Sequence, residues 1–218
     1  MIPFHKVNLQ TVASIFLLQS LLLFASNALG QAYKIVMLGD SLTAGYGVGQ
    51  ENAFPSFAEK TLRSQKIDVE LINAGVSGST TASAVPRLKW LLNGKPTHLF
   101  LALGANDGLR GFDLTTTKKN LKNAIELAQK NEVKVLLAGM LIPPNYGPEY
   151  TEKFRKLFFE LAKEQKIPLL PFLLEGVAGE KKLNIADGIH PNIEGHKIIA
   201  KNVAAFLQKQ LIEKNVKK

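Results

Sequence analysis

The sequence contains no cysteine and only a single tryptophan. A chain without cysteine has no disulfide framework, no cysteine nucleophile and no thiolate metal site. After residue 31 the sequence also lacks internal repeats and Pro/Gly/Ser-rich linkers. Its 218 residues, 46% of them hydrophobic, are sufficient to bury one sizeable core. We therefore expect one domain over residues 31–218, with two domains as the weaker alternative.

Residues 1–30 have the composition of a targeting segment. His5 and Lys6 precede the apolar run VASIFLLQSLLLFAS, and small residues follow it up to Gly30. Basic, apolar and small-residue segments in this order are typical of a secretory signal peptide. The apolar run is shorter than the roughly 20 residues that a membrane span needs. We predict cleavage after Ala28 or Gly30 and export to the periplasm or the exterior, with an uncleaved N-terminal anchor as the alternative.

The formal net charge is +9, and it falls to +8 without residues 1–30, which hold one lysine and no acid. A basic surface can attract phosphates, anionic lipids or nucleic acid. The lysines are spread over predicted helices and form no block of five or six like charges, which indicates solvated helix faces. We expect no nucleic-acid partner, at most weak contact with an anionic membrane surface, and a monomer.

Apolar segments rich in Val, Ile and Leu alternate with helix-like segments after residue 31. The apolar runs are nearly continuous, which is typical of strands that are covered on both faces. Repeated strand–helix–strand units predict a parallel sheet with right-handed crossovers, and hence one three-layer α/β domain. The strands are expected at 34–40, 69–75, 98–104, 133–139 and 168–172, and the helices at 54–63, 84–92, 116–130, 148–166 and 193–211.

Polar and small residues stand where these strands end. Ser41 follows the first strand, Gly78 follows the second, and Asn106 follows the third. The sequence DGIHP, which contains Asp187 and His190, precedes the last helix. In parallel α/β sheets, ligand sites lie beyond the carboxyl ends of the strands. We therefore expect these five residues to meet at one edge of the sheet.

These residue types are the parts of a serine acyl-transfer site. A serine hydroxyl becomes a good nucleophile when a base accepts its proton; His190 is the candidate base. Asp187 lies three residues earlier and could orient the imidazole. The amides of Ser41 and Gly78 and the side chain of Asn106 could donate to an oxyanion. Each residue alone also has a structural explanation: a helix cap for Ser41, and turns or surface positions for the others.

Four short blocks together resemble the SGNH, or GDSL-type, hydrolases. They are GDSL at 39–42, GVSGST with Gly78, GAND at 104–107 and DGIH at 187–190, in the family's order. The longer stretches GDSLTAGYG, GANDGLRGF, PPNYG and DGIHPN are similar to the bacterial TesA-type branch of exported thioesterases, arylesterases and lysophospholipases. The resemblance covers nearly the whole chain after residue 31.

The resemblance implies a flavodoxin-like fold with a five-stranded parallel sheet, and neither a metal nor an organic cofactor. It implies a catalytic triad of Ser41, Asp187 and His190, with an oxyanion hole of Ser41, Gly78 and Asn106. The implied reaction is hydrolysis of an acyl ester, an acyl-CoA or a lysophospholipid through an acyl-enzyme. Two alternatives stay open: carbohydrate O-deacetylation, and a non-catalytic basic binding module.

Apolar residues in the loops expected after the third and fourth strands favour an acyl group over a sugar. Sugar sites need aromatic platforms with polar rims, whereas acyl chains need an aliphatic trough. The one tryptophan, Trp90, lies far in sequence from the four blocks. Glycines on both sides of Leu109 and Arg110 would let this segment close over a bound chain; a rigid turn that only positions Asn106 is the alternative. The predicted substrate-binding residues are Leu109, Phe112, Ile142, Pro143 and Tyr146.

Overall fold

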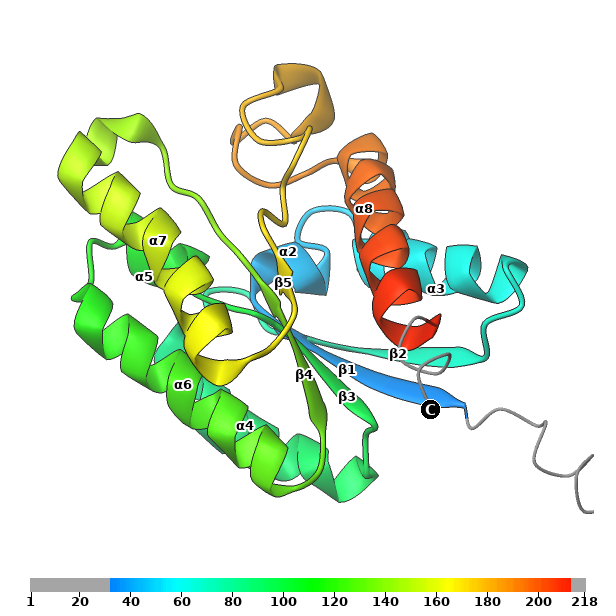
Figure 1. Cartoon of the computed structure of the whole chain (residues 1–218). Coiled ribbons are helices and arrows are strands. Elements are labelled where there is room, and N and C mark those ends of the chain that lie inside the picture. Colours follow the sequence, from blue (N-terminus) through cyan, green and yellow to red (C-terminus); the bar gives the residue numbers. More distant parts are fainter. Residues whose placement is uncertain (1–31, 213–218) are drawn as a thin grey trace, which may run out of the picture. The chain divides into compact units, whose positions relative to one another are not determined.

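A computed structural model describes residues 32–212 of the chain. At its centre lies a sheet of five strands, all parallel, in the order β2-β1-β3-β4-β5 (Figure 1). Helices cover both faces of this sheet, which is why its strands are mostly apolar. The strands are β1 (Tyr33–Gly39), β2 (Val69–Gly75), β3 (His98–Ala102), β4 (Lys134–Ala138) and β5 (Leu169–Leu170).

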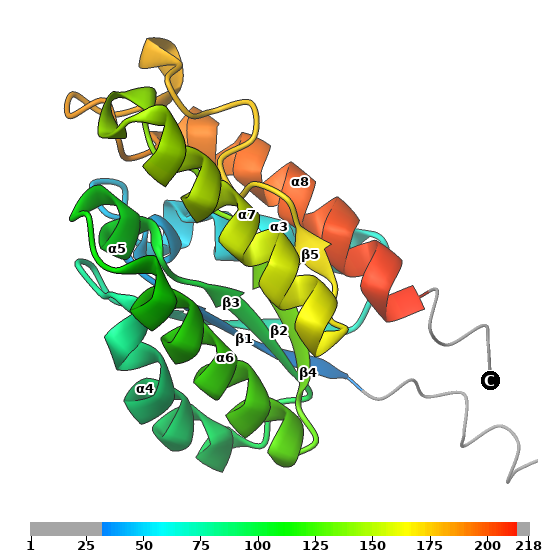
Figure 2. The same cartoon turned by 60° about the vertical axis from the view of Figure 1, so that its left-hand side comes forward.

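Five helices of the described residues form the two outer layers. Helices α3 and α8 pack against each other on one face, and α4, α6 and α7 cover the other face (Figures 1 and 2). Each helix buries an apolar stripe; in α6 this stripe includes Leu121, Ile125 and Ala128. The bounds are α3 (Phe54–Ser64), α4 (Ala84–Leu91), α6 (Leu114–Lys130), α7 (Pro148–Gln165) and α8 (Ile193–Ile212).

The strand register brings three chain segments to one edge of the sheet. Gly39, the last residue of β1, pairs with Gly75 of β2 and with Ala102 of β3. The segments that follow these three strands therefore leave the sheet at the same level. These segments carry the serine, glycine and asparagine blocks that the sequence placed at the strand ends.

Short helices follow two of the strands. Helix α2 (Ser41–Ala44) follows β1, and α5 (Ala105–Leu109) follows β3. Each is about one turn long, so neither can show the apolar periodicity that predicts a helix. Five 3₁₀ turns also occur in the described residues: η1 (Gln50–Asn52), η2 (Thr81–Ser83), η3 (Leu92–Gly94), η4 (Pro144–Tyr146) and η5 (Lys181–Leu183).

The predicted α/β fold with a five-stranded parallel sheet is confirmed. Every predicted strand and every predicted long helix agrees with the structure to within two residues at each end. Strand β5 has only two residues, Leu169 and Leu170, because Pro168 and Pro171 flank it and cannot donate to a strand ladder.

The predicted signal peptide, residues 1–30, lies outside the described residues. Within residues 32–212, no helix combines the length and the apolar character that a membrane crossing requires. All the strands and long helices of this range belong to the one sheet and its two covering layers.

Candidate active site

The junction between β1 and α2 places Ser41 at the carboxyl edge of the sheet. Asp40, and not Ser41, caps the helix, and Ser41 is its first residue. A side chain at Gly39 would meet the Thr43 hydroxyl at 1.9 Å, and one at Gly75 would meet the backbone of α2 at 2.2 Å. Both glycines therefore let the helix sit directly on the strand ends. The helix does not use the N–H of its first residue, which leaves the Ser41 amide available to a ligand.

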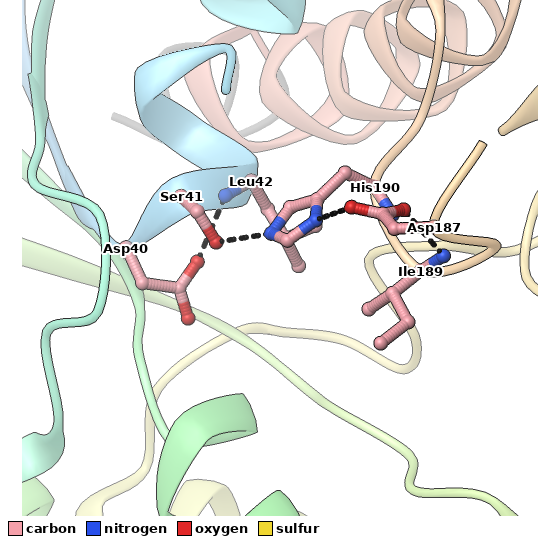
Figure 3. A network of polar contacts seen from close by, with 6 residues as sticks. All are labelled: Asp40, Ser41, Leu42, Asp187, Ile189 and His190. Atoms are coloured by element: carbon pink, nitrogen blue, oxygen red, sulfur yellow. Dashed lines mark hydrogen bonds and ion pairs between the residues drawn. The ribbon is translucent and has the colours of Figure 1, made fainter. Parts of the chain in front are cut away.

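Ser41, His190 and Asp187 are joined by two hydrogen bonds (Figure 3). The Ser41 Oγ is 2.8 Å from His190 Nε2, and His190 Nδ1 is 2.7 Å from Asp187 Oδ2. In the tautomer protonated at Nδ1, the imidazole donates to Asp187 and its Nε2 accepts the Ser41 hydroxyl. The imidazole therefore lies within the reach that a general base needs.

The backbone of the DGIH turn holds the Asp187 carboxylate in place. Its Oδ1 accepts the N–H groups of Ile189 at 2.9 Å and His190 at 3.0 Å. Gly188 takes a φ of +73°, which closes the turn and favours glycine. Hydrogen bonds from the His190 and Ile189 amides and from the imidazole lower the pKa of Asp187 to about 2. The carboxylate is therefore ionised over the whole pH range in which an imidazole titrates.

Asp40 is a second carboxyl group next to Ser41, and it is buried. Its side chain is 1% exposed, and its Oδ1 accepts the N–H of Leu42 at 3.0 Å. Burial raises the pKa of Asp40 to about 6, while the Leu42 hydrogen bond and the charge of His190 act in the opposite direction. The site thus contains two carboxyl groups whose surroundings move their pKa values apart.

Gly78 and Asn106 come together after β2 and β3. Gly78 is the third residue of a turn that the Ser79 N–H closes on the Val76 carbonyl at 3.1 Å. Its φ of +78° is the conformation that favours glycine at this position of a turn. The Asn106 Nδ2 donates to the Ser79 carbonyl at 3.0 Å. This bond fixes the amide beside the Gly78 turn and leaves its second N–H for another acceptor.

Residues 37–198 match the GDSL-like lipase/acylhydrolase family. The chain belongs to this family. An arylesterase of Vibrio mimicus is 39% identical over 197 residues, which are 89% of this chain and 98% of that protein. The thioesterase 1/protease 1/lysophospholipase L1 of Escherichia coli is 36% identical over 194 residues, which are 88% of this chain and 90% of that protein.

A solved structure of a relative has the same fold as this GDSL-like hydrolase. It is the psychrotrophic esterase EstA from Pseudoalteromonas sp., inhibited by monoethylphosphonate, with 35% identity and a TM-score of 0.78. The match covers 82% of this chain and 98% of that chain. The resemblance to the GDSL-type hydrolases is therefore confirmed, and so is the predicted enzyme class: the protein is a GDSL-type esterase/thioesterase.

Three of the predicted substrate-binding residues of this hydrolase meet at α5. The Tyr146 hydroxyl donates to the Leu109 carbonyl at 2.7 Å. A side chain at Gly108 would meet Ile142 Cγ2 at 2.7 Å, so Ile142 packs directly against the helix. Pro143 immediately precedes η4, the 3₁₀ turn that carries Tyr146. Leu109 is the last residue of α5, which corrects the expectation that it lies in a loop.

The segment after α5 is held by contacts on both sides. The Phe112 carbonyl accepts the Tyr150 hydroxyl at 2.8 Å, while the Phe112 side chain is 44% exposed. Arg110, which the sequence indicated to be solvated, is exposed but donates to the Gly78 carbonyl at 3.2 Å. These contacts favour the rigid-turn alternative for the backbone, because they tie α5 to the Gly78 turn and the segment after it to α7.

A cavity of about 510 Å³ lies between the end of β2 and helix α4. Trp90, which is 74% exposed, lines it together with Val76, two residues before Gly78. The distance of Trp90 in sequence from the four blocks therefore wrongly suggested that it lies far from the site. Helix α4 folds back and brings it beside the end of β2. Arg87 lines the same cavity.

Several residues around the site were not identified from the sequence. Asp107 is 2% exposed and accepts the Thr81 N–H at 2.9 Å and the Thr81 hydroxyl at 2.5 Å, so it anchors α5 to η2. Tyr46 contacts the His190 ring. Arg87 bonds to both strand ends that flank the site. Arg87 could have been noticed in the sequence, because it stands three residues after Ala84, which is buried, and so lies on the same face of the helix.

The other two histidines of residues 32–212, His98 and His196, are buried within the fold. His196 is 1% exposed, and its Nδ1 accepts the Phe54 N–H at 3.2 Å. Burial lowers the pKa of His196 to about 4, which keeps it neutral. His98, in β3, contacts the Thr97 hydroxyl at 2.9 Å. No group of three or more His, Asp or Glu side chains that could hold a metal occurs in the described residues.

Proposed function

We propose that the protein hydrolyses acyl esters and thioesters through a covalent acyl-enzyme on Ser41. The observation that carries this proposal is the pair of hydrogen bonds, 2.8 Å and 2.7 Å long, from Ser41 to His190 to Asp187. In this mechanism His190 accepts the Ser41 proton as Oγ attacks the substrate carbonyl. Asp187 holds the imidazole in its tautomer and stabilises the imidazolium that forms.

The negative charge that develops on the substrate oxygen needs preorganised donors. The N–H groups of Ser41 and Gly78 and the second N–H of the Asn106 amide are the proposed donors. When the tetrahedral intermediate collapses, the imidazolium gives its proton to the leaving alcohol or thiol, and the acyl group stays on Ser41. A water molecule, deprotonated by His190, then attacks the acyl-enzyme; the imidazolium returns this proton to Ser41 Oγ as its bond to the acyl carbon breaks, and the carboxylic acid leaves.

The proposed substrates are small molecules with an acyl chain: aryl or alkyl esters, acyl-CoA and lysophospholipids. The residues proposed to contact the chain are Leu109, Phe112, Ile142, Pro143 and Tyr146, which surround α5 directly after Asn106. The names of the relatives, arylesterase and thioesterase/lysophospholipase, support this range of substrates. They do not favour the two alternatives, carbohydrate deacetylation and a binding module without catalysis.

The test of the nucleophile is Ser41→Ala with p-nitrophenyl butyrate as substrate. The variant should lose at least about 10³-fold in kcat, because only binding and oxyanion effects remain. A fluorophosphonate probe should label the wild-type protein and not the variant. Ser64→Ala at the exposed end of α3 is the matched control and should keep both activity and labelling. Turnover of Ser41→Ala at the rate of the wild type would refute the proposal.

We also propose that residues 1–30 direct export and are removed, so that the mature enzyme begins near Gln31 and acts outside the cytoplasm as a monomer. The order of basic, apolar and small residues in this segment supports the proposal. N-terminal sequencing of the protein recovered from the periplasm and the medium tests it. A protein that retains residues 1–30 in the membrane fraction would indicate the uncleaved anchor.

A further inference from the structure

Arg87 connects three segments that meet at the proposed oxyanion hole. Its Nη1 donates to the carbonyl of Gly39 and to the Ser79 hydroxyl, both at 3.0 Å. Its Nη2 donates to the carbonyl of Ala74. The guanidinium thus bonds to the end of β1, the end of β2 and the turn after β2, although Arg87 itself belongs to α4.

Two of these acceptors, Gly39 and Ser79, lie close to the proposed oxyanion donors. Gly39 precedes Ser41 by two residues, and its carbonyl also accepts the Val76 N–H at 3.2 Å, at the start of the Gly78 turn. Ser79 follows Gly78 directly, and its carbonyl holds the Asn106 amide at 3.0 Å. Through Gly39 and Ser79, the Arg87 side chain is therefore linked to the chain segments that carry all three proposed donors.

Removal of the Arg87 guanidinium would remove three hydrogen bonds at a half-buried position. Arg87 is half-buried, and this burial lowers the pKa of its guanidinium from the ordinary value, while the negative charge of Asp40 acts in the opposite direction. Arginine suits this position because its planar head presents several donors in a fixed geometry. A lysine has one compact ammonium group, which cannot occupy the positions of two separate nitrogens.

We propose that Arg87 is a positioning residue that holds the three oxyanion donors at the spacing that the transition state requires. The proposal rests on the acyl-transfer function proposed above. Arg87 does not contact the reacting atoms in this view; it acts through the backbone of Gly39 and Ala74 and through Ser79. Displacement of catalytic groups by about 1 Å can lower a rate about 10²-fold, so a residue with this role affects catalysis strongly.

The test compares Arg87→Lys and Arg87→Met with the wild type in three measurements. These are kcat and KM for p-nitrophenyl butyrate, the inhibition constant of an alkyl trifluoromethyl ketone, and the melting temperature. The ketone adds to the serine and forms a tetrahedral oxyanion, so its affinity reports on the oxyanion hole. We expect kcat to fall about 10-fold for lysine and about 10²-fold for methionine, with KM within about threefold. The inhibition constant should rise by the same factors as kcat falls.

Two further variants complete the test. Ser79→Ala removes one acceptor of Arg87 and leaves its carbonyl partners, so it should lower kcat and ketone affinity together by about two- to fivefold. It decides the test if both Arg87 variants fail to fold. Arg155→Met removes an exposed arginine of α7 that pairs with Glu152, and it should leave all three measurements unchanged.

Folded Arg87→Lys and Arg87→Met enzymes with wild-type kcat and wild-type ketone affinity would overturn the proposal and leave Arg87 with a role in stability alone. A fall in kcat without a matching loss of ketone affinity would overturn it as well. If the wild-type enzyme neither hydrolyses the ester nor reacts with a fluorophosphonate, the acyl-transfer function itself has failed. The failure of the proposed function can thus be distinguished from the failure of the role of Arg87.

Discussion

Tyr46 lies against the imidazole of His190, with ring centroids 4.7 Å apart and ring planes inclined by 46°. The Tyr46 N–H donates to the Ser41 carbonyl at 3.1 Å, so Ser41, the proposed nucleophile, also places this ring. Gly45 ends α2 in the left-handed conformation, with a φ of +78°, and turns the chain so that Tyr46 can reach the imidazole. An aromatic ring in this position restricts rotation of the imidazole.

We predict that Tyr46→Leu lowers kcat/KM about three- to tenfold, because the ring contact with the imidazole contributes about 0.5–1.5 kcal/mol. Tyr46→Phe keeps the ring and should stay within about twofold of the wild type. Initial rates with p-nitrophenyl butyrate measure both variants. An equal loss in the two variants would show that the hydroxyl, and not the ring, is the important group.

The second prediction concerns Asp187. Because hydrogen bonds lower its pKa to about 2, Asp187 stays ionised while the imidazole titrates. Asp187 should therefore add no ionisation of its own to the kcat/KM profile between about pH 4 and 8. Asp187→Asn should lower kcat about 10²- to 10⁴-fold through loss of the correct imidazole orientation. The exposed Asp68→Asn is the control, and a wild-type kcat in Asp187→Asn would contradict the role given to Asp187.

The third prediction concerns Asp40 and stability. Burial raises the pKa of Asp40 to about 6, whereas an unfolded aspartate titrates near 3.9. Between these pH values the folded state binds the proton more tightly, so the contribution of Asp40 to the free energy of unfolding falls as the pH rises. At about pH 7.5, Asp40→Asn should therefore raise the free energy of unfolding by about 1–3 kcal/mol.

The difference between Asp40→Asn and the wild type should vanish near pH 4, where the wild-type carboxyl is protonated in the folded state. Asparagine can still accept the Leu42 N–H that Asp40 accepts, so the helix cap is kept. Urea unfolding at both pH values measures the effect. Asp187→Asn is a control of opposite sign, because the Asp187 pKa is lowered and not raised. An Asp40→Asn protein that is less stable than the wild type at the higher pH would contradict the prediction.

The sequence was sufficient for the fold because local and long-range preferences agree. The apolar run of β3 needs cover on both faces, and the apolar stripes of the helices on the two sides of the sheet provide it. The parallel arrangement then requires that residues after neighbouring strands meet at one edge. The structure indeed brings Ser41, His190 and Asp187 into hydrogen-bond contact, while their catalytic roles stay proposals.

The residues that support the site could not be predicted from the sequence, because their partners are set by tertiary packing. Arg87 reaches the carbonyl of Gly39, 48 positions away, through a side chain whose direction depends on how α4 lies beside β2. For Asp107 the sequence favours a local hydrogen bond, because an aspartate in a turn commonly bonds to its own backbone. Its partner is instead Thr81, 26 positions earlier. Periodicity indicates which face of a helix is buried, but it does not identify the acceptor that a buried polar group finds.

The last prediction concerns the length of the acyl chain. Leu109 and Phe112 follow Asn106, and the Tyr146 and Tyr150 hydroxyls donate to their carbonyls at 2.7 Å and 2.8 Å. These bonds hold the backbone, whereas the Phe112 ring is 44% exposed and free to cover a bound chain. We propose that the two side chains contact methylene groups of the substrate, each of which contributes up to about 0.8 kcal/mol when buried.

Leu109→Ala and Phe112→Ala should therefore lose about four- to tenfold in kcat/KM with octanoyl and longer p-nitrophenyl esters, and less than about twofold with the acetyl ester. Tyr146→Phe, which removes only the hydroxyl that holds the Leu109 carbonyl, separates contact with the chain from support of the backbone. If it lowers kcat/KM equally for all chain lengths, this hydrogen bond positions Asn106. An equal loss at every chain length in the two alanine variants as well would show that the segment positions the oxyanion hole and does not discriminate between acyl chains.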